Sequence, residues 1–152
     1  MPPKNWATVI ETPIIFTENY EELVEPVGIL ETIRDLKAFQ AGSAGSETVE
    51  EIRAYGDRIA SVPGKRGLNA FAETGLDAFL REREITDVAL AGVVTSLCID
   101  STGRAAHERG FRVTILQDCT CGRTDYEQEF YCREVFPFYG LVTDSKSWLS
   151  GL

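Results

Sequence analysis

An unbroken apolar run, VALAGVV at residues 88–94, constrains the fold more than any other feature of this sequence. Such a run is typical of a parallel β-strand that helices cover on both faces. Residues 72–83 before it predict an amphipathic helix, because their apolar side chains recur at helical spacing. Residues 98–109 after it predict a second helix, and Gly110 suits the end of that helix.

The rest of the chain also alternates between strand and helix patterns. Further strands are expected at residues 6–16, 58–63, 112–116 and 141–143. Further helical segments are expected at residues 29–36, 46–55 and 126–136. Strands that alternate with helices pair in parallel through right-handed crossovers. We therefore predict an α/β protein, a three-layer α/β/α sandwich around a mostly parallel, Rossmann-like sheet, with residues 1–152 forming one domain.

The charge balance narrows the class of partner. The chain has 15 Lys and Arg residues against 24 Asp and Glu residues, which gives a formal net charge of -9. A strongly acidic protein repels phosphate backbones and anionic lipids, so we expect neither nucleic acid nor membrane partners. No apolar run reaches the roughly 20 residues of a membrane span, and the first residues lack a secretory pattern. These features predict a cytoplasmic protein.

The cysteines give no sign of a disulfide framework or a metal site. There are four of them, Cys98, Cys119, Cys121 and Cys132, and without an export signal we expect them to be free thiols. The spacing of Cys119 and Cys121 does not fit a zinc knuckle, and the single histidine, His107, falls in a helical pattern elsewhere. We therefore predict no metal and no cofactor.

Cys98 follows the apolar strand at a chemically favourable point. The strand stops at Val94, Thr95 or Ser96 can cap a helix, and Cys98 then falls in the first turn of that helix. Unpaired backbone N–H groups and the positive end of the helix dipole favour the thiolate, which is the nucleophilic form. The same N–H groups can hold an oxyanion. Spacing alone favours a plainer reading, in which Cys98 is a buried small hydrophobe.

Lys65 adds a second candidate. It follows the strand expected at residues 58–63, and the carboxyl ends of parallel strands meet at one edge of a sheet. An ammonium group near a thiol favours the thiolate. Taken alone, however, Lys65 is more simply a solvated loop residue beside Arg66.

Several segments resemble the isochorismatase-like cysteine hydrolase family. KRGLNAF at 65–71 is similar to the family's lysine motif, with Asn69 where serine is common. GVVTSLC at 92–98 resembles its nucleophile segment, and residues 101–113 resemble the helix and strand that follow. QDC at 117–119 lies where the family often has Asp-Ala or Asp-Cys.

The resemblance implies a catalytic Cys–Lys–Asp triad in a sheet of strand order 3-2-1-4-5-6. Cys98 would attack the carbonyl carbon of a small amide-like or carbonyl substrate, and Lys65 would help to hold the thiolate. Phe71, which ends the lysine motif, is expected to line the substrate pocket. A non-proline cis peptide bond is expected between Val94 and Thr95, where it would aim N–H groups into an oxyanion hole.

One departure from the family pattern affects both fold and chemistry. The family's catalytic aspartate ends its first strand, whereas residues 6–16 resemble the second strand, and their only acid is Glu11. Three explanations stay open: a truncated product, a strand supplied by a partner in a homo-oligomer, or residues 6–15 filling the central place in the sheet. We predict a hydrolase acting through Cys98. The alternative is an impaired family member that serves as a binding or assembly subunit.

Overall fold

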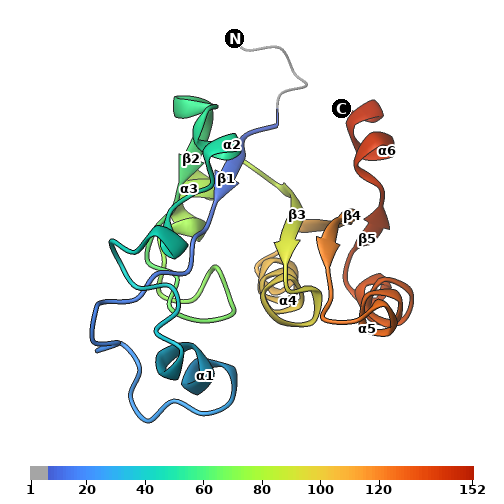
Figure 1. The fold of residues 1–152 in the computed structure, drawn as a ribbon. Helices are drawn as coiled ribbons and strands as arrows, with labels where there is room; N and C mark the ends of the chain where they lie inside the picture. Colours follow the sequence, from blue (N-terminus) through green and yellow to red (C-terminus); the bar gives the residue numbers. More distant parts are fainter. Residues whose placement is uncertain (1–6) are drawn as a thin grey trace. The chain divides into compact units, whose positions relative to one another are not determined.

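The structure is a computed structural model, and it describes residues 7–152 as two compact units (Figure 1). We call residues 8–67 and 72–75 the N-terminal unit, and residues 68–71 and 76–152, with Ala7, the C-terminal unit. In the described part of the chain no helix is both long and apolar enough to cross a membrane.

The C-terminal unit contains a three-stranded parallel sheet in the order β3-β4-β5. Its strands are β3 (Asp87–Val93), β4 (Arg112–Cys121) and β5 (Leu141–Thr143). The register between β3 and β4 shifts between Leu90 and Gly92. This shift lets β4 run beyond residue 116, where the expected strand ended, because its last residues pair with the end of β3.

The helices of the C-terminal unit are α3 (Leu76–Glu82), α4 (Asp100–Glu108), α5 (Asp125–Phe130) and α6 (Ser145–Ser150). Of these, α4 and α5 lie in the connections between the three strands, and α6 follows β5 (Figure 1). A π-helical turn, Thr95–Ile99, precedes α4, and a second π-helical turn, Tyr131–Val135, follows α5 and leads into a 3-10 turn, Phe136–Phe138. The helix predicted at 72–83 is confirmed over α3, although residues 72–75 are not helical. The helices predicted at 98–109 and 126–136 are also confirmed, each with a π-helical turn that helical periodicity does not distinguish.

The helix α6 was not predicted. It begins because the Asp144 side chain accepts a hydrogen bond from the Ser147 N–H at 2.8 Å, a helix cap. Asp118, on β4, accepts further bonds from the Ser145 N–H at 2.8 Å and the Ser145 hydroxyl at 2.6 Å. These bonds lower the pKa of Asp118. The two hydrogen bonds from Ser145 to Asp118 thus fix the first turn of α6 to β4.

The N-terminal unit is less regular. It contains a parallel pair of strands, β1 (Val9–Glu11) and β2 (Ile59–Ser61). Its helices are α1 (Ile29–Asp35) and α2 (Glu50–Arg53), with 3-10 turns at Ala44–Ser46 and Gly56–Arg58. The helix predicted at 29–36 is confirmed, whereas the segment at 46–55 is helical only in α2.

The strand predicted at residues 6–16 is much shorter in the structure, and residue 6 lies outside the described residues. After β1 the chain makes only isolated parallel bridges, at Ile14 with Lys65 and at Phe16 with Gln40. Pro13 lies between β1 and these bridges, and proline lacks the N–H that a continuous ladder needs.

Residues 14–38 build a small core of their own. Phe16, Tyr20 and Ile33 are buried, and Ile14, Leu23, Leu30 and Ala38 pack against them. The Tyr20 hydroxyl donates a hydrogen bond to the Ala38 carbonyl at 2.8 Å. This segment is therefore held by packing, although it contains only one short helix.

All described strand pairs are parallel, as the sequence predicts for a mixed α/β protein. They form a two-stranded sheet and a three-stranded sheet. Within the described residues β1 pairs only with β2, and β3 pairs only with β4, so each has one edge without a strand neighbour.

Candidate active site

Cys98 lies in the π-helical turn that joins β3 to α4. The Val94 carbonyl accepts hydrogen bonds from the Leu97 N–H at 3.0 Å and the Ile99 N–H at 3.3 Å, which closes the turn. The Asp100 N–H, at the start of α4, donates to the carbonyls of Leu97 and Thr95. The predicted position at the start of a helix is thus correct, but the first turn is wider than an α-helical one. The Cys98 side chain is half-buried.

The cis peptide bond is one residue earlier than predicted. It joins Val93 to Val94, whereas the resemblance placed it between Val94 and Thr95. The reason is that β3 ends at Val93 and the π-helical turn already begins at Thr95. Val94, which is extended at φ -97° and ψ 142°, is the only residue between the strand and the turn. The chain therefore leaves the strand at the bond between Val93 and Val94, which is the cis bond.

Thr95, the first residue of the turn, is completely buried. Its hydroxyl donates a hydrogen bond to Oε1 of Gln128, on α5, at 2.5 Å. Gln128 was not among the predicted site residues. The sequence offers one signal for Gln128, which is its spacing. It lies four residues after the capping residue Thr124 and four before Cys132, and this spacing places the three residues near one face of a helix.

Glu127, the neighbour of Gln128, is also buried and lies beside Ser96. The Ser96 hydroxyl, followed by the Arg123 guanidinium at 2.8 Å, holds the pKa of Glu127 below its usual range. Even so, Ser96 Oγ and Glu127 Oε1 are buried atoms without a hydrogen bond of standard geometry among the described residues. The two groups are therefore close enough to interact electrostatically but are not well aligned.

Lys65 belongs to the N-terminal unit, where it is buried with 4% of its surface exposed. Its backbone forms the bridge with Ile14, and its carbonyl accepts a bond from the Ile15 N–H at 3.4 Å. The reading of Lys65 as an ordinary solvated loop lysine is therefore wrong. A buried lysine is uncommon, because the ammonium group must give up water.

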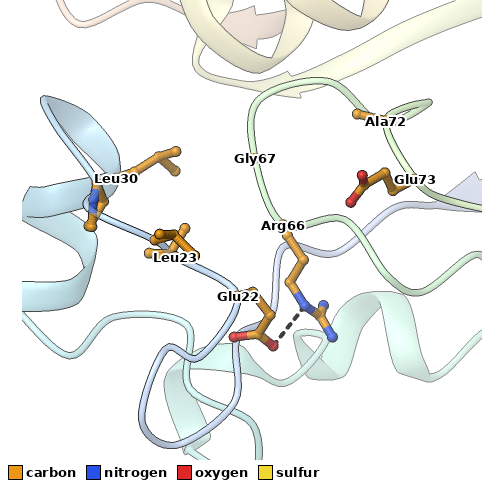
Figure 2. A pocket seen from close by; sticks show the side chains of 9 residues that line it. Glu22, Leu23, Leu30, Arg66, Gly67, Ala72 and Glu73 are labelled. Atoms are coloured by element: carbon orange, nitrogen blue, oxygen red, sulfur yellow. Dashed lines mark hydrogen bonds and ion pairs between the residues drawn. The ribbon is translucent and has the colours of Figure 1, made fainter.

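The neighbouring Arg66 lines a pocket of about 310 Å³ in the N-terminal unit (Figure 2). Its Nε donates to the Glu22 carboxylate at 2.9 Å, and Glu22 also accepts from the Thr17 N–H at 2.9 Å. The other lining residues are Leu23, Val24, Pro26, Leu30, Gly67, Ala72 and Glu73. The pocket combines an apolar wall with an internally paired arginine, and none of the predicted site residues lines it.

The segment predicted as the lysine motif crosses from one unit to the other. Residues 65–67 belong to the N-terminal unit, and residues 68–71 belong to the C-terminal unit. There the Ala70 N–H donates to the hydroxyl of Thr102, on α4, at 3.1 Å. The end of the motif is thus bonded to the helix that follows the Cys98 turn.

Phe71 packs in the core of the C-terminal unit. It is 6% exposed, its ring centroid is 5.9 Å from that of Phe111, and the Arg109 guanidinium lies 5.0 Å from its centroid. Its described contacts are therefore structural, and the substrate-pocket role predicted for it stays a prediction.

None of the four cysteines forms a disulfide, and their surroundings differ. Cys119 and Cys121 are exposed, and Cys132 is buried, where burial raises the pKa of its thiol. Among residues 7–152, no group of three or more His, Cys, Asp or Glu side chains is placed to hold a metal ion.

The isochorismatase domain matches residues 5–147 of this chain. The chain belongs to the isochorismatase family. Among curated members, it is 33% identical over 85 residues to the uncharacterized isochorismatase family protein YwoC of Bacillus subtilis, covering 56% of this chain and 45% of YwoC. It is 29% identical over 108 residues to nicotinamidase 3 of Arabidopsis thaliana, covering 71% of this chain and 54% of that protein. These matches span about half the length of the curated relatives.

Solved structures of isochorismatase-like proteins share the fold. An isochorismatase-like hydrolase from Alkaliphilus metalliredigens aligns with a TM-score of 0.79 at 25% identity, covering 93% of this chain and 71% of that one. A cysteine hydrolase from Pseudomonas syringae aligns with a TM-score of 0.82 at 19% identity, covering 94% and 70%. The family resemblance and the parallel α/β fold predicted from the sequence are therefore confirmed.

Proposed function

We propose that this isochorismatase family protein is a hydrolase in which Cys98 attacks the carbonyl carbon of a small amide-like substrate. The observation that carries the proposal is the place of Cys98, in a π-helical turn between the parallel strand β3 and the helix α4. Backbone N–H groups and the helix dipole at such a turn favour a thiolate and the oxyanion that its attack produces.

The reaction proceeds in two balanced steps. The Cys98 thiolate bonds to the carbonyl carbon, the C–N bond breaks, and the amine leaves after taking up a proton. Water then attacks the resulting thioester, which releases the acid, returns a proton to solvent and regenerates the thiolate. Without a positioned general base, both proton transfers are slower, typically by about 10²–10⁴-fold.

We assign Lys65 the role of stabilising the thiolate. The support comes from the lysine motif and from the burial of Lys65, which is uncommon for a lysine. Cys98 and Lys65 belong to different units, so this assignment rests on the motif and not on a distance between them.

The amide class of substrate is supported by the names of the relatives. They include nicotinamidase 3, a streptothricin hydrolase and ureidoacrylate amidohydrolases. All three names describe hydrolysis, and two specify an amide bond. We therefore favour C–N bond hydrolysis for this chain.

A screen of nicotinamide, simple primary amides and ureido compounds tests the proposal by measuring ammonia or amine release. Turnover by the wild-type protein that is lost in Cys98→Ala and kept in Cys121→Ala supports it. Cys121 is a suitable control because it is an exposed free thiol in the same unit. Tight binding of one of these compounds without any turnover would contradict the hydrolase and support the alternative, a binding or assembly subunit.

We also propose that the protein is a cytoplasmic homo-oligomer. Several large aromatic side chains of the C-terminal unit are exposed, including Phe138 at 87% and Tyr126 at 78%. Exposed aromatic residues are enriched at protein interfaces. Light scattering after size-exclusion chromatography tests this assembly, and a monomer at all concentrations would contradict it.

A further inference from the structure

We propose that Gln128 is a positioning residue for Cys98. Its side-chain amide holds Thr95, and through Thr95 it fixes the π-helical turn that carries the thiol. The inference rests on the proposed nucleophilic role of Cys98, and it concerns how the protein keeps that sulfur and the adjacent N–H groups in place.

Thr95 takes part in two hydrogen bonds that tie the turn to neighbouring helices, one with α4 and one with α5. Its carbonyl accepts a bond from the Asp100 N–H at the start of α4, and its hydroxyl donates to Gln128 Oε1 at 2.5 Å. The residue is completely buried, so water does not replace either bond when one is lost. The orientation of the turn therefore depends on where the Gln128 amide sits.

That amide is itself fixed. Its Nε2 approaches three acceptors: the Gln117 carbonyl at 3.1 Å, Thr120 Oγ1 at 3.0 Å and Cys132 Sγ at 3.5 Å. Because the oxygen accepts from Thr95 while the nitrogen donates to the opposite side, the amide has a single favourable orientation. Gln117 and Thr120 belong to β4, so Gln128 links α5, β4 and the Cys98 turn.

The helix that carries Gln128 is well anchored. The Thr124 hydroxyl caps α5 by accepting a bond from the Glu127 N–H at 3.1 Å, and Arg123 pairs with the Glu127 carboxylate. Glu127 lies beside Ser96 without a well-aligned bond, as described above. Of the two adjacent α5 side chains at the turn, Gln128 therefore makes the aligned contact.

This geometry matters for chemistry because a nucleophile and its oxyanion donors act only when they are held in place. If the amide is removed, the turn gains freedom and the N–H groups near Cys98 no longer point in one direction. We expect a fall in kcat with little change in KM, and slower alkylation of Cys98 at neutral pH.

The test compares Gln128→Met, which keeps the length of the side chain but removes every bond, with Thr95→Val, which removes the same bond from the other side. Iodoacetamide alkylation of Cys98 is followed by mass spectrometry from pH 5 to pH 10. Each variant is expected to lower the rate at pH 7 by about tenfold and to move the pH midpoint upward. Thr95→Ser, which keeps the hydroxyl, should restore the wild-type rate within about twofold.

Glu129→Gln is the matched control, because Glu129 is the next residue on α5, is exposed and pairs only with Arg133 among its described contacts. It should leave the pH profile unchanged. A double variant, Thr95→Val with Gln128→Met, should be no slower than Gln128→Met alone, because that change already removes the bond to Thr95.

Hydrogen exchange separates this inference from the proposed function. Faster exchange of the Leu97 and Ile99 amides in Gln128→Met supports the positioning role even if no amide substrate is turned over. Wild-type exchange at both amides, together with a wild-type pH profile of alkylation in folded Gln128→Met, would overturn it. An unreactive Cys98 in the wild-type protein would instead overturn the proposed nucleophile.

Discussion

The two candidate site residues lie in regions of very different construction. Cys98 sits in the C-terminal unit, where a seven-residue strand, a closed turn and the nine-residue helix α4 follow one another without interruption. Lys65 sits in the N-terminal unit, where the strands have three residues each and isolated bridges replace a continuous ladder. In the regular region local spacing fixes the candidate residue Cys98, whereas in the irregular region packing between distant segments fixes the candidate residue Lys65.

The largest effect that would sharpen this comparison is the loss of turnover on substitution of Lys65. We expect Lys65→Met to lower amide turnover by about 100-fold, since the thiolate loses the cation assigned to it. Arg66→Met is the neighbouring control, and its effect should be less than about threefold, because Arg66 pairs with Glu22. Steady-state kinetics on the best substrate of the screen, with unfolding curves to verify folding, measure both. Equal losses in the two variants would contradict a specific role for Lys65.

A smaller effect is expected on stability, where one glycine substitution in each unit compares how tightly the two units are packed. A Cβ added at Gly140 would lie 2.9 Å from the Val113 carbonyl oxygen on β4, so Gly140→Ala forces backbone to move. We expect a loss of roughly 1–3 kcal/mol in the free energy of unfolding, measured with urea. Gly67→Ala, at a site with nothing within 4 Å of the added atom, should be close to neutral. A neutral Gly140→Ala would show that the β4 and β5 region is looser than described.

The smallest effect concerns acid stability of the N-terminal unit. Burial by itself raises the pKa of Glu22, but hydrogen bonds from its own N–H and from Thr17, together with Arg66, outweigh this and lower it. A lowered pKa in the folded state means that the carboxylate stabilises the fold above its unfolded pKa of about 4.3, and that this contribution is lost as pH falls through the folded value.

Glu22→Gln should therefore be less stable than the wild type by about 1 kcal/mol at pH 7 and should match it near pH 3. Urea unfolding at both pH values measures the difference. A constant difference at the two pH values would show that the ionised carboxylate is not the cause.

Sequence reasoning succeeded where local pattern decides structure. The apolar run at 88–94 predicted β3, and the residues after it predicted the turn and helix that follow. The expected strand at residues 6–16 was too long, because Pro13 interrupts pairing that depends on Lys65 and Gln40 from distant parts of the chain. The core around Phe16 and Tyr20 also depends on such distant contacts, which composition and periodicity do not reveal.

In the candidate site, too, features set by local pattern were predicted and features set by distant contacts were not. Cys98 was found from its place after an apolar strand, and the cis peptide bond was misplaced by one residue because spacing does not define where a strand ends. Gln128 was missed because its bond to Thr95 joins residues 33 positions apart. Side-chain hydrogen bonds of this range leave no periodic trace in a sequence.

The most direct test of the account is the reactivity of Cys98 relative to the exposed thiols Cys119 and Cys121 of the same unit. Limiting iodoacetamide is added to the native protein at pH 7, and the adducts are mapped by mass spectrometry. We expect Cys98, although less exposed, to be alkylated at least about tenfold faster than either, and we expect this preference to disappear in denaturant. Alkylation of Cys119 and Cys121 before Cys98 in the native protein would contradict an activated thiolate.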